Sequence, residues 1–280
     1  GDRAGVGAST VSVAQALASL GDYSQAEPLL REALTIQQAI NNRWEEWLIW
    51  NELGILYWLV GQAERAIEHL QTGLACSHAI ESEIGAAYIL CNLGQVLRDA
   101  NRLAEAEETL RTGMALAVAQ GDRNLQAIYH TDLALTLLQA GTDQLAHDEA
   151  DLARQQFVEL GLESSTTPNL ATMAAAHLAL NNRDEARTCA LTCLELLAGE
   201  AGETADFPQR DTILCAQVLQ QLGEDGLARQ STLRARHLLD AKAARISDAE
   251  MRASYLHNVW FNRLIVQMSQ VWSDGVTSDR

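Results

Sequence analysis

Several cysteine and histidine residues have side chains that could bind a metal or act in catalysis. Cys189 and Cys193 lie one helical turn apart, but no histidine or second cysteine pair completes a zinc site at local spacing. The run His147-Asp148-Glu149 lacks the second histidine of a zinc-protease helix. The sequence also lacks a glycine-rich phosphate loop and a nucleophile elbow. We therefore expect no metal, no cofactor and no enzymatic activity in this chain.

The other histidines and cysteines are expected to be packing residues. His130 and His177 fall at core-facing positions of the periodic pattern described next, where a hydrogen-bonded imidazole is the common outcome. The five cysteines have no framework spacing, which favours reduced thiols within helices. They are Cys76, Cys91, Cys189, Cys193 and Cys215. Because nothing resembles a signal peptide, we expect the chain to be cytoplasmic.

Small residues recur along the chain and define the elements that would position any functional side chain. A Gly or Asn is followed five residues later by Ala in six places, spaced by 40 residues and finally by 42. The pairs are Gly21/Ala26, Gly61/Ala66, Asn101/Ala106, Gly141/Ala146, Asn181/Ala186 and Gly223/Ala228. Such a period predicts stacked structural repeats, which usually form interaction surfaces.

Each repeat is predicted to be a helix, a turn and a second helix. The Gly or Asn marks the turn, since both adopt the left-handed conformation at a helix end. Further small residues stand twelve positions before and seven after each Ala, as Gly54 and Gly73 do in the second repeat. These would let two antiparallel helices approach closely. Ser24 with Glu27 has the pattern of a capping box, with Pro28 expected within the first turn of the second helix.

One repeat carries a family resemblance. Its key residues are Trp50, Leu53, Gly54, Tyr57, Gly61, Ala66 and Leu70. This set resembles the tetratricopeptide repeat, and weaker versions extend over roughly residues 7–245. The family's usual unit has about 34 residues. The longer unit here resembles the arrays attached to bacterial signal-transduction ATPases and large LuxR-type regulators. The resemblance implies an all-α, right-handed superhelical solenoid of about six antiparallel helix hairpins.

The domain organisation follows from this pattern. We expect a repeat array over residues 1–245, capping helices over 246–273 and a tail over 274–280. Ser247 and Glu250 form a second capping-box pattern before an apolar helical segment. That segment is either a cap for the last hairpin or a helix that docks a partner or dimerises. The opening Gly1-Asp2-Arg3 has the phase of an inter-repeat joint, so we expect the natural protein to continue upstream.

The charge balance limits the partners. The chain has 37 acidic and 20 basic residues, a net charge of −17. This field repels phosphate backbones and anionic lipid surfaces, so we expect no binding to nucleic acid by this segment. The sequence also has no run of about eighteen apolar residues, so we expect no membrane span.

The resemblance assigns the groove of the array to fixed positions on the first helix of each hairpin. Our candidate partner-binding residues at these positions are Leu48, Asn51, Ile55, Trp58, Tyr88, Gln95, Arg98, Ile128, Thr131 and Leu135. This apolar stripe is either core between tightly wound repeats or a groove for a partner. Trp58, with Tyr88 and Arg98, is the best anchor, and Trp44 with Trp47 is a second candidate patch. Trp50 is expected in the core.

Two functional hypotheses remain open. The first is a scaffold that binds a protein or peptide, used as the sensor or recruitment segment of a larger bacterial regulator. An apolar groove within an acidic surface favours a helical or extended segment with basic edges. The alternative is a regulatory domain that binds a small-molecule effector in the groove, near Asn51, Gln95, Arg98 and Thr131.

Overall fold

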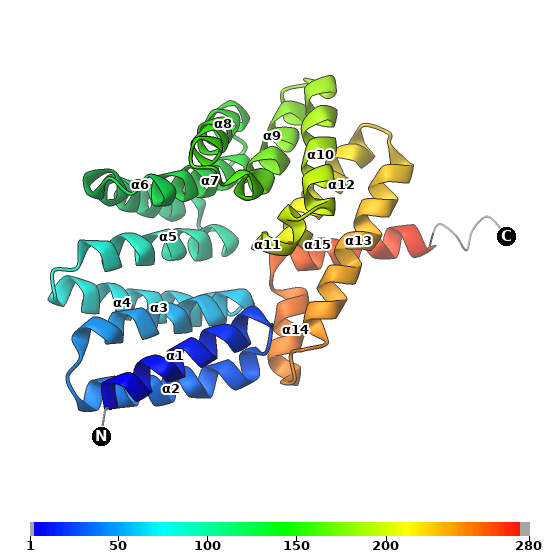
Figure 1. Ribbon diagram of the computed structural model, residues 1–280. Helices are drawn as coiled ribbons and strands as arrows, with labels where there is room; N and C mark the ends of the chain where they lie inside the picture. The colour runs from blue at the N-terminus through cyan, green and yellow to red at the C-terminus, as the bar shows by residue number, and fades with distance from the viewer. Residues whose placement is uncertain (1–2, 275–280) are drawn as a thin grey trace. The chain divides into compact units, whose positions relative to one another are not determined.

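The computed structural model describes residues 3–274, and the secondary structure of these residues is entirely helical (Figure 1). The predicted all-α class with repeated helix hairpins is confirmed. The positions Gly1, Asp2 and most of the expected tail, 275–280, lie outside the described residues. The chain divides into two compact units, and each is described by itself.

The first unit comprises residues 1–121 and 241–259. Its helices are α1 (Arg3–Ser19), α2 (Tyr23–Ala39), α3 (Arg43–Leu59), α4 (Ala63–Ala79), α5 (Glu83–Asp99), α6 (Leu103–Gln120) and α14 (Ala249–His257). Helices α1 to α6 pair in sequence as three hairpins, and adjacent hairpins also touch (Figure 1). Tyr23, Leu53, Tyr57 and Leu70 are fully buried between them.

Of the described residues, the second unit comprises 122–240 and 260–274. Its helices are α7 (Arg123–Gln139), α8 (Asp143–Glu159), the 3-10 helix η1 (Glu163–Thr166), α9 (Thr167–Ala179), α10 (Arg183–Ala198), α11 (Ala201–Thr204), α12 (Pro208–Gln221) and α15 (Trp260–Asp274). Most of α13 (Asp225–Ala243) also belongs to it. Its core contains Leu170, Leu197 and Leu219.

Hairpin geometry follows from the small residues. The six turn residues have positive φ, from +61° at Asn101 to +86° at Gly21. Inside the hairpins, a Cβ on Gly54 would stand 2.5 Å from Leu70 Cγ, and one on Gly94 would stand 2.5 Å from Leu110 Cγ. Only glycine lets the backbone lie this close to the facing leucine, because Cβ atoms do not approach other heavy atoms to 2.5 Å. The paired helices are therefore held closer than larger residues would allow.

Both predicted capping boxes are wrong. Helix α2 begins at Tyr23, and the Asp22 carboxylate accepts the hydrogen bond from the Gln25 N–H at 3.3 Å. Because the helix begins there, Pro28 lies inside α2 rather than in its first turn. At α14 the N-cap is Asp248, which accepts from the Met251 N–H at 2.7 Å. In each case a nearby aspartate, two residues before Ser24 or one after Ser247, supplies a charged acceptor, which the positive end of a helix favours.

The freed Ser24 hydroxyl takes part in a contact between distant parts of the first unit. Its Oγ accepts a hydrogen bond from the Asp248 N–H at 3.1 Å, and Arg245 Nη1 donates to the Leu20 carbonyl oxygen at 3.0 Å. We call residues 241–259 the clasp. Within the first unit, the clasp packs on the turns at Gly21 and Gly61.

The segment 246–273, for which we predicted capping helices, thus contains two helices with different surroundings. Helix α14 belongs to the first unit, and α15 belongs to the second, where it packs against α12 (Figure 1). None of the helices described here combines the length and the hydrophobicity that a membrane span requires.

Candidate partner-binding surface

In the first unit, the candidate groove residues lie on α3 and α5, which are the equivalent helices of consecutive hairpins. They differ in exposure: Leu48, Ile55, Trp58 and Gln95 are half-buried, Tyr88 is 41 % exposed, and Asn51 and Arg98 are buried. The stripe is thus divided into two buried polar residues, Asn51 and Arg98, and a partly exposed group that is apolar apart from Gln95. Only the second group offers surface to a partner.

A polar network connects the two helices and fixes the orientation of Trp58. Trp58 Nε1 donates a hydrogen bond to Asp99 Oδ2 at 2.8 Å, and Arg98 Nε donates to Asp99 Oδ1 at 2.9 Å. Asn92 Nδ2 donates to Asn51 Oδ1 at 2.8 Å, one further link between α5 and α3. Because the Arg98 side chain is only 2 % exposed, its ion pair with Asp99 is shielded from solvent. The indole of Trp58 is therefore held in place before any partner arrives.

Towards the N-terminal ends of the same two helices is an aromatic edge, which we define as Trp44, Trp47, Ile84 and Tyr88. Trp44 is 55 % exposed and Ile84 is 53 % exposed, whereas Trp47 is buried. The Trp44 and Trp47 rings meet edge to face, with their centroids 6.3 Å apart. A Cβ on Gly85 would stand 3.0 Å from the Trp47 ring, so glycine lets the indole lie on the α5 backbone. The edge is supported at Trp44, whose ring rests on the buried Trp47.

Sequence analysis did not single out Ile84. It stands one period of 40 residues after Trp44, and this equivalence could have identified it. Its neighbour Gly85 was a further signal, because a glycine in the first turn of a helix leaves space for a large side chain.

The remaining candidates lie in the second unit, where Ile128 is half-buried and the other two are buried. Ile128, Thr131 and Leu135 all lie on α7. Ile128 packs against a cluster that contains Phe157, and Leu135, 2 % exposed, belongs to the large core cluster of that unit. Thr131 is buried, and its hydroxyl donates to the Ala127 carbonyl oxygen at 3.0 Å.

A charged cluster around Tyr57 also looks like a functional site. The Glu27 carboxylate accepts hydrogen bonds from the Tyr57 hydroxyl and from Arg31 Nε, and the Arg65 guanidinium lies 3.8 Å from the centroid of the Tyr57 ring. Burial acts to raise the pKa of Glu27, but these hydrogen bonds and the two arginines lower it below its usual range. The cluster connects α2, α3 and α4, so its evident role is to hold two hairpins together.

Tyr57 and Trp50 also pack on one imidazole. The His69 ring centroid lies 5.1 Å from that of Tyr57 and 5.4 Å from that of Trp50. Trp50, predicted to lie in the core, is half-buried by this contact.

Three of the histidines have close polar or aromatic partners. His130 Nδ1 lies 2.6 Å from Glu149 Oε2, and the rings of His147 and His177 have centroids 4.6 Å apart. All five thiols are free. Among the described residues, no three histidine, cysteine or acidic side chains are placed to hold one metal ion.

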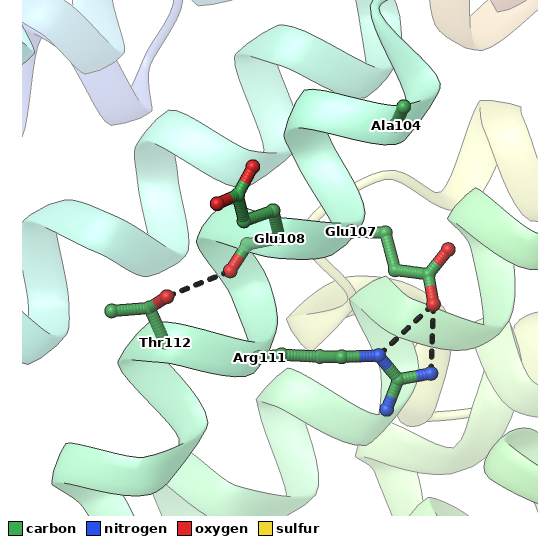
Figure 2. A pocket seen from close by; sticks show the side chains of 5 residues that line it. All are labelled: Ala104, Glu107, Glu108, Arg111 and Thr112. Atoms are coloured by element: carbon green, nitrogen blue, oxygen red, sulfur yellow. Dashed lines mark hydrogen bonds and ion pairs between the residues drawn. The ribbon is translucent and has the colours of Figure 1, made fainter.

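A shallow depression on α6 is lined by Ala104, Glu107, Glu108, Arg111 and Thr112, all from one helix (Figure 2). Figure 2 shows two of these side chains bonded to each other: Arg111 Nη2 lies 2.8 Å from Glu107 Oε1. The Thr112 hydroxyl donates to the Glu108 carbonyl oxygen at 2.8 Å. Because the depression is open and is lined by a single helix, on which Arg111 and Glu107 pair with each other, nothing in it points to a ligand.

Comparison with known sequences identifies the repeats in the first unit. Residues 6–43 and residues 45–119 match two family models, both described as tetratricopeptide repeat. Together they cover the three hairpins that carry the candidate surface. A search of curated proteins gives no match.

Solved structures of similar fold include three of interest. The apo form of RapI has a TM-score of 0.69 and 14 % identity, covering 97 % of this chain and 99 % of that one. A Rap protein complexed with Competence and Sporulation Factor has a TM-score of 0.66 and 13 % sequence identity. The match covers 95 % of this chain and 75 % of that one. A signal transduction ATPase with a tetratricopeptide repeat sensor, from Pyrococcus horikoshii, has a TM-score of 0.64 and 16 % sequence identity. The match covers 91 % of this chain and 39 % of that one. At these identities the likeness establishes the fold.

Proposed function

Because residues 6–43 and 45–119 are tetratricopeptide repeats, we propose that the first unit is a binding module for a protein or peptide segment. The contact surface consists of the aromatic edge and the half-buried groove residues of α3 and α5. The observation that carries the proposal is the exposure of Trp44, Ile84 and Tyr88 in the first two turns of α3 and α5, where Trp44 packs on the buried Trp47.

Exposure of this kind is unusual within a packed repeat array. Single exposed apolar residues are common, but here three large ones lie within the first two turns of two neighbouring helices, and one of them packs on a buried indole. Aromatic residues in such surfaces commonly supply most of the binding energy. Because Trp58 is already oriented, little side-chain entropy would be lost on binding.

Charge indicates the chemistry of the partner. The chain carries a net charge of −17, and the exposed Glu83 lies beside Ile84 at the aromatic edge. A segment with large apolar residues would bind the apolar surface, and basic flanks would be attracted by the acidic residues around it. Such a segment is either a helix laid across the two hairpins or an extended strand of peptide.

A larger regulatory context is part of the proposal. The chain aligns with 39 % of an ATPase whose name includes a tetratricopeptide repeat sensor, and one similar Rap protein was solved in complex with a factor. By analogy, the repeats would serve as the sensor or recruitment segment of a bacterial cytoplasmic regulator. This analogy supports the role and leaves the partner's identity to experiment.

The small-molecule alternative remains a prediction. The polar groups that it requires in the first unit are already engaged, since Asn51 accepts from Asn92 and Arg98 donates to Asp99. A broad metabolite panel in a thermal-shift assay tests it, because a ligand that binds the folded state raises Tm.

Site-specific photo-crosslinking in cells tests the proposed surface. A photoreactive phenylalanine is placed at Tyr88 and, as a matched control, at Val118, an α6 residue that is 57 % exposed. We expect a discrete adduct from position 88 but not from 118, and its loss when Trp44→Ala is added. Equal adducts from both positions, or an adduct that Trp44→Ala leaves unchanged, would contradict the assignment.

A further inference from the structure

Asn169, in the first turn of α9, has an amide group buried in the second unit. The residue is fully buried, and neither Oδ1 nor Nδ2 has a hydrogen-bond partner among the described residues. At the same position of three earlier repeats stand Ile49, Ile89 and Tyr129, which are also fully buried. The position therefore belongs to the core of the repeat. An amide is costly there, because a buried polar group without a partner has lost its hydrogen bonds to water.

The next repeat shows how a polar residue at this position can be satisfied. Asp211 is the equivalent residue of α12, and it is buried as well. Its carboxylate accepts hydrogen bonds from the Thr167 hydroxyl at 2.9 Å and from Arg210 Nε at 2.9 Å. The residue one period before Thr167 is Ala127 on α7, which has no hydroxyl to offer Asn169. The amide on α9 thus lacks the kind of donor that α9 itself supplies to α12.

The start of α9 is weakly capped. Its N-cap residue, Thr166, makes no side-chain hydrogen bond to the helix, and Pro168 in the first turn has no backbone N–H. Two hydrogen bonds to other helices involve this turn, and both are made by Thr167. Its hydroxyl donates to Asp211, and its carbonyl oxygen accepts from Cys193 Sγ at 3.3 Å. The position of the turn therefore depends strongly on one residue.

We propose that residues 163–170, which comprise η1 and the first turn of α9, form an opening segment. This segment leaves the core of the second unit as one local unit while the other helices stay folded. Asn169 favours opening, because its amide has no partner in the closed state and reaches water in the open one. Thr167 opposes opening through its bond to Asp211. The segment lies in the second unit, so this proposal and the binding surface of the first unit can fail separately.

Two substitutions of a polar by an apolar residue should have opposite effects on opening. Asn169→Ile places in α9 the residue that stands at Ile49 and Ile89, and it removes the unpaired amide. It should make opening about tenfold rarer. Thr167→Val removes the donor to Asp211 and should make opening about tenfold more frequent. Added hydrophobicity alone would shift both variants in the same direction.

Amide hydrogen exchange of the full chain, followed by NMR at several urea concentrations below unfolding, measures the opening. The N–H groups of residues 171–173 donate to the carbonyls of residues 167–169 in α-helical geometry, so they report on the first turn. Residues 131–133 of α7, one period earlier, are the matched control. We expect residues 171–173 to exchange faster and almost independently of urea, because local opening exposes little surface. Residues 131–133 should follow global unfolding.

The wild-type measurement alone can overturn the proposal. It does so if exchange at residues 171–173 rises with urea as steeply as exchange at residues 131–133. The variants provide an independent check at residues 171–173. If Asn169→Ile leaves exchange unchanged or accelerates it, the amide is satisfied in the folded chain, for instance by an internal water molecule, and the proposal is wrong. Slower exchange in Thr167→Val would also contradict it. If Asn169→Ile loses its helical circular dichroism, the smaller Asn169→Val replaces it.

Discussion

Gly61 lies directly against the backbone of Ser254: a Cβ atom on Gly61 would stand 3.0 Å from the Ser254 carbonyl oxygen. The same atom would stand 2.9 Å from Asn258 Cβ and 3.0 Å from the Val259 nitrogen. Two of these three neighbours are backbone atoms, which cannot rotate away. A hairpin turn of the first unit is thus fitted to a clasp that is almost two hundred residues distant in sequence.

The turn at Gly141 provides a matched control for this contact. Gly61 and Gly141 both have φ of +74°, but no atom lies within 4 Å of a Cβ on Gly141. Asparagine already occupies the left-handed turn positions at Asn101 and Asn181. We expect Gly141→Asn to change stability little and Gly61→Asn to lower the free energy of unfolding by about 1–3 kcal/mol. Urea denaturation measures both, and equal losses would mean that the clasp does not press on the turn.

The contacts of Ser24 and Gly61 show where sequence reasoning reaches its limit. The turn residues were predictable, because glycine and asparagine adopt positive φ at little cost and recur at a fixed period. The capping role of Asp22 was missed, since Ser24 fits the same local pattern and its hydroxyl instead binds Asp248. No local pattern reveals a partner so distant in the chain.

The candidate groove shows the same limit. Ile55 and Leu135 are aliphatic residues at equivalent positions of the repeat, yet only Leu135 is fully packed. Leu135 belongs to the large core cluster of the second unit, so the difference comes from tertiary packing. Periodicity therefore predicted which residues share a face, but not which of them a partner can reach.

Asp99 is predicted to stabilise the first unit more than any exposed acidic residue of α6. It accepts hydrogen bonds from both Trp58 and Arg98, and the Arg98 side chain is buried. Asp99→Ala should lower the free energy of unfolding by about 3 kcal/mol, because it removes the charge partner of a buried cation. Trp58→Phe, which removes one hydrogen bond, should cost about 1 kcal/mol.

The control for Asp99 is Glu107→Ala, which removes an ion pair to Arg111 on the solvent side of α6. Exposed pairs contribute little, so this variant should unfold close to wild type. Thermal and urea denaturation of the three variants give the comparison. A loss at Glu107 as large as that at Asp99 would show that burial is not the cause.

The stability of the chain should depend on pH through His177. Burial, and next the nearby His147, lower the pKa of His177 below its usual value of 6.5. The unfolded chain therefore binds a proton at a pH where the folded chain does not. The free energy of unfolding should rise with pH up to about 6.5 and then level off. His69, whose pKa burial also lowers, contributes in the same direction.

Urea denaturation between about pH 5 and pH 8 measures this dependence. His177→Gln should make the rise shallower without abolishing it, since His69 remains. A slope that is unchanged in the variant would show that His177 titrates alike in both states.

The five thiols should react in an order set by burial. Cys91, Cys193 and Cys215 are buried, whereas Cys76 and Cys189 are half-buried. A thiolate is the reactive form, and burial raises the pKa of Cys76 and of Cys189. At Cys193 the neighbouring Cys215 thiol and then burial raise the pKa further.

Iodoacetamide followed by mass spectrometry should label Cys76 and Cys189 slowly and leave Cys193 unlabelled in the folded chain. In denaturing urea all five should react alike. Labelling of folded Cys193 as fast as Cys76 would mean that α10 and α12 separate readily, and the core beneath α15 would then be open rather than closed.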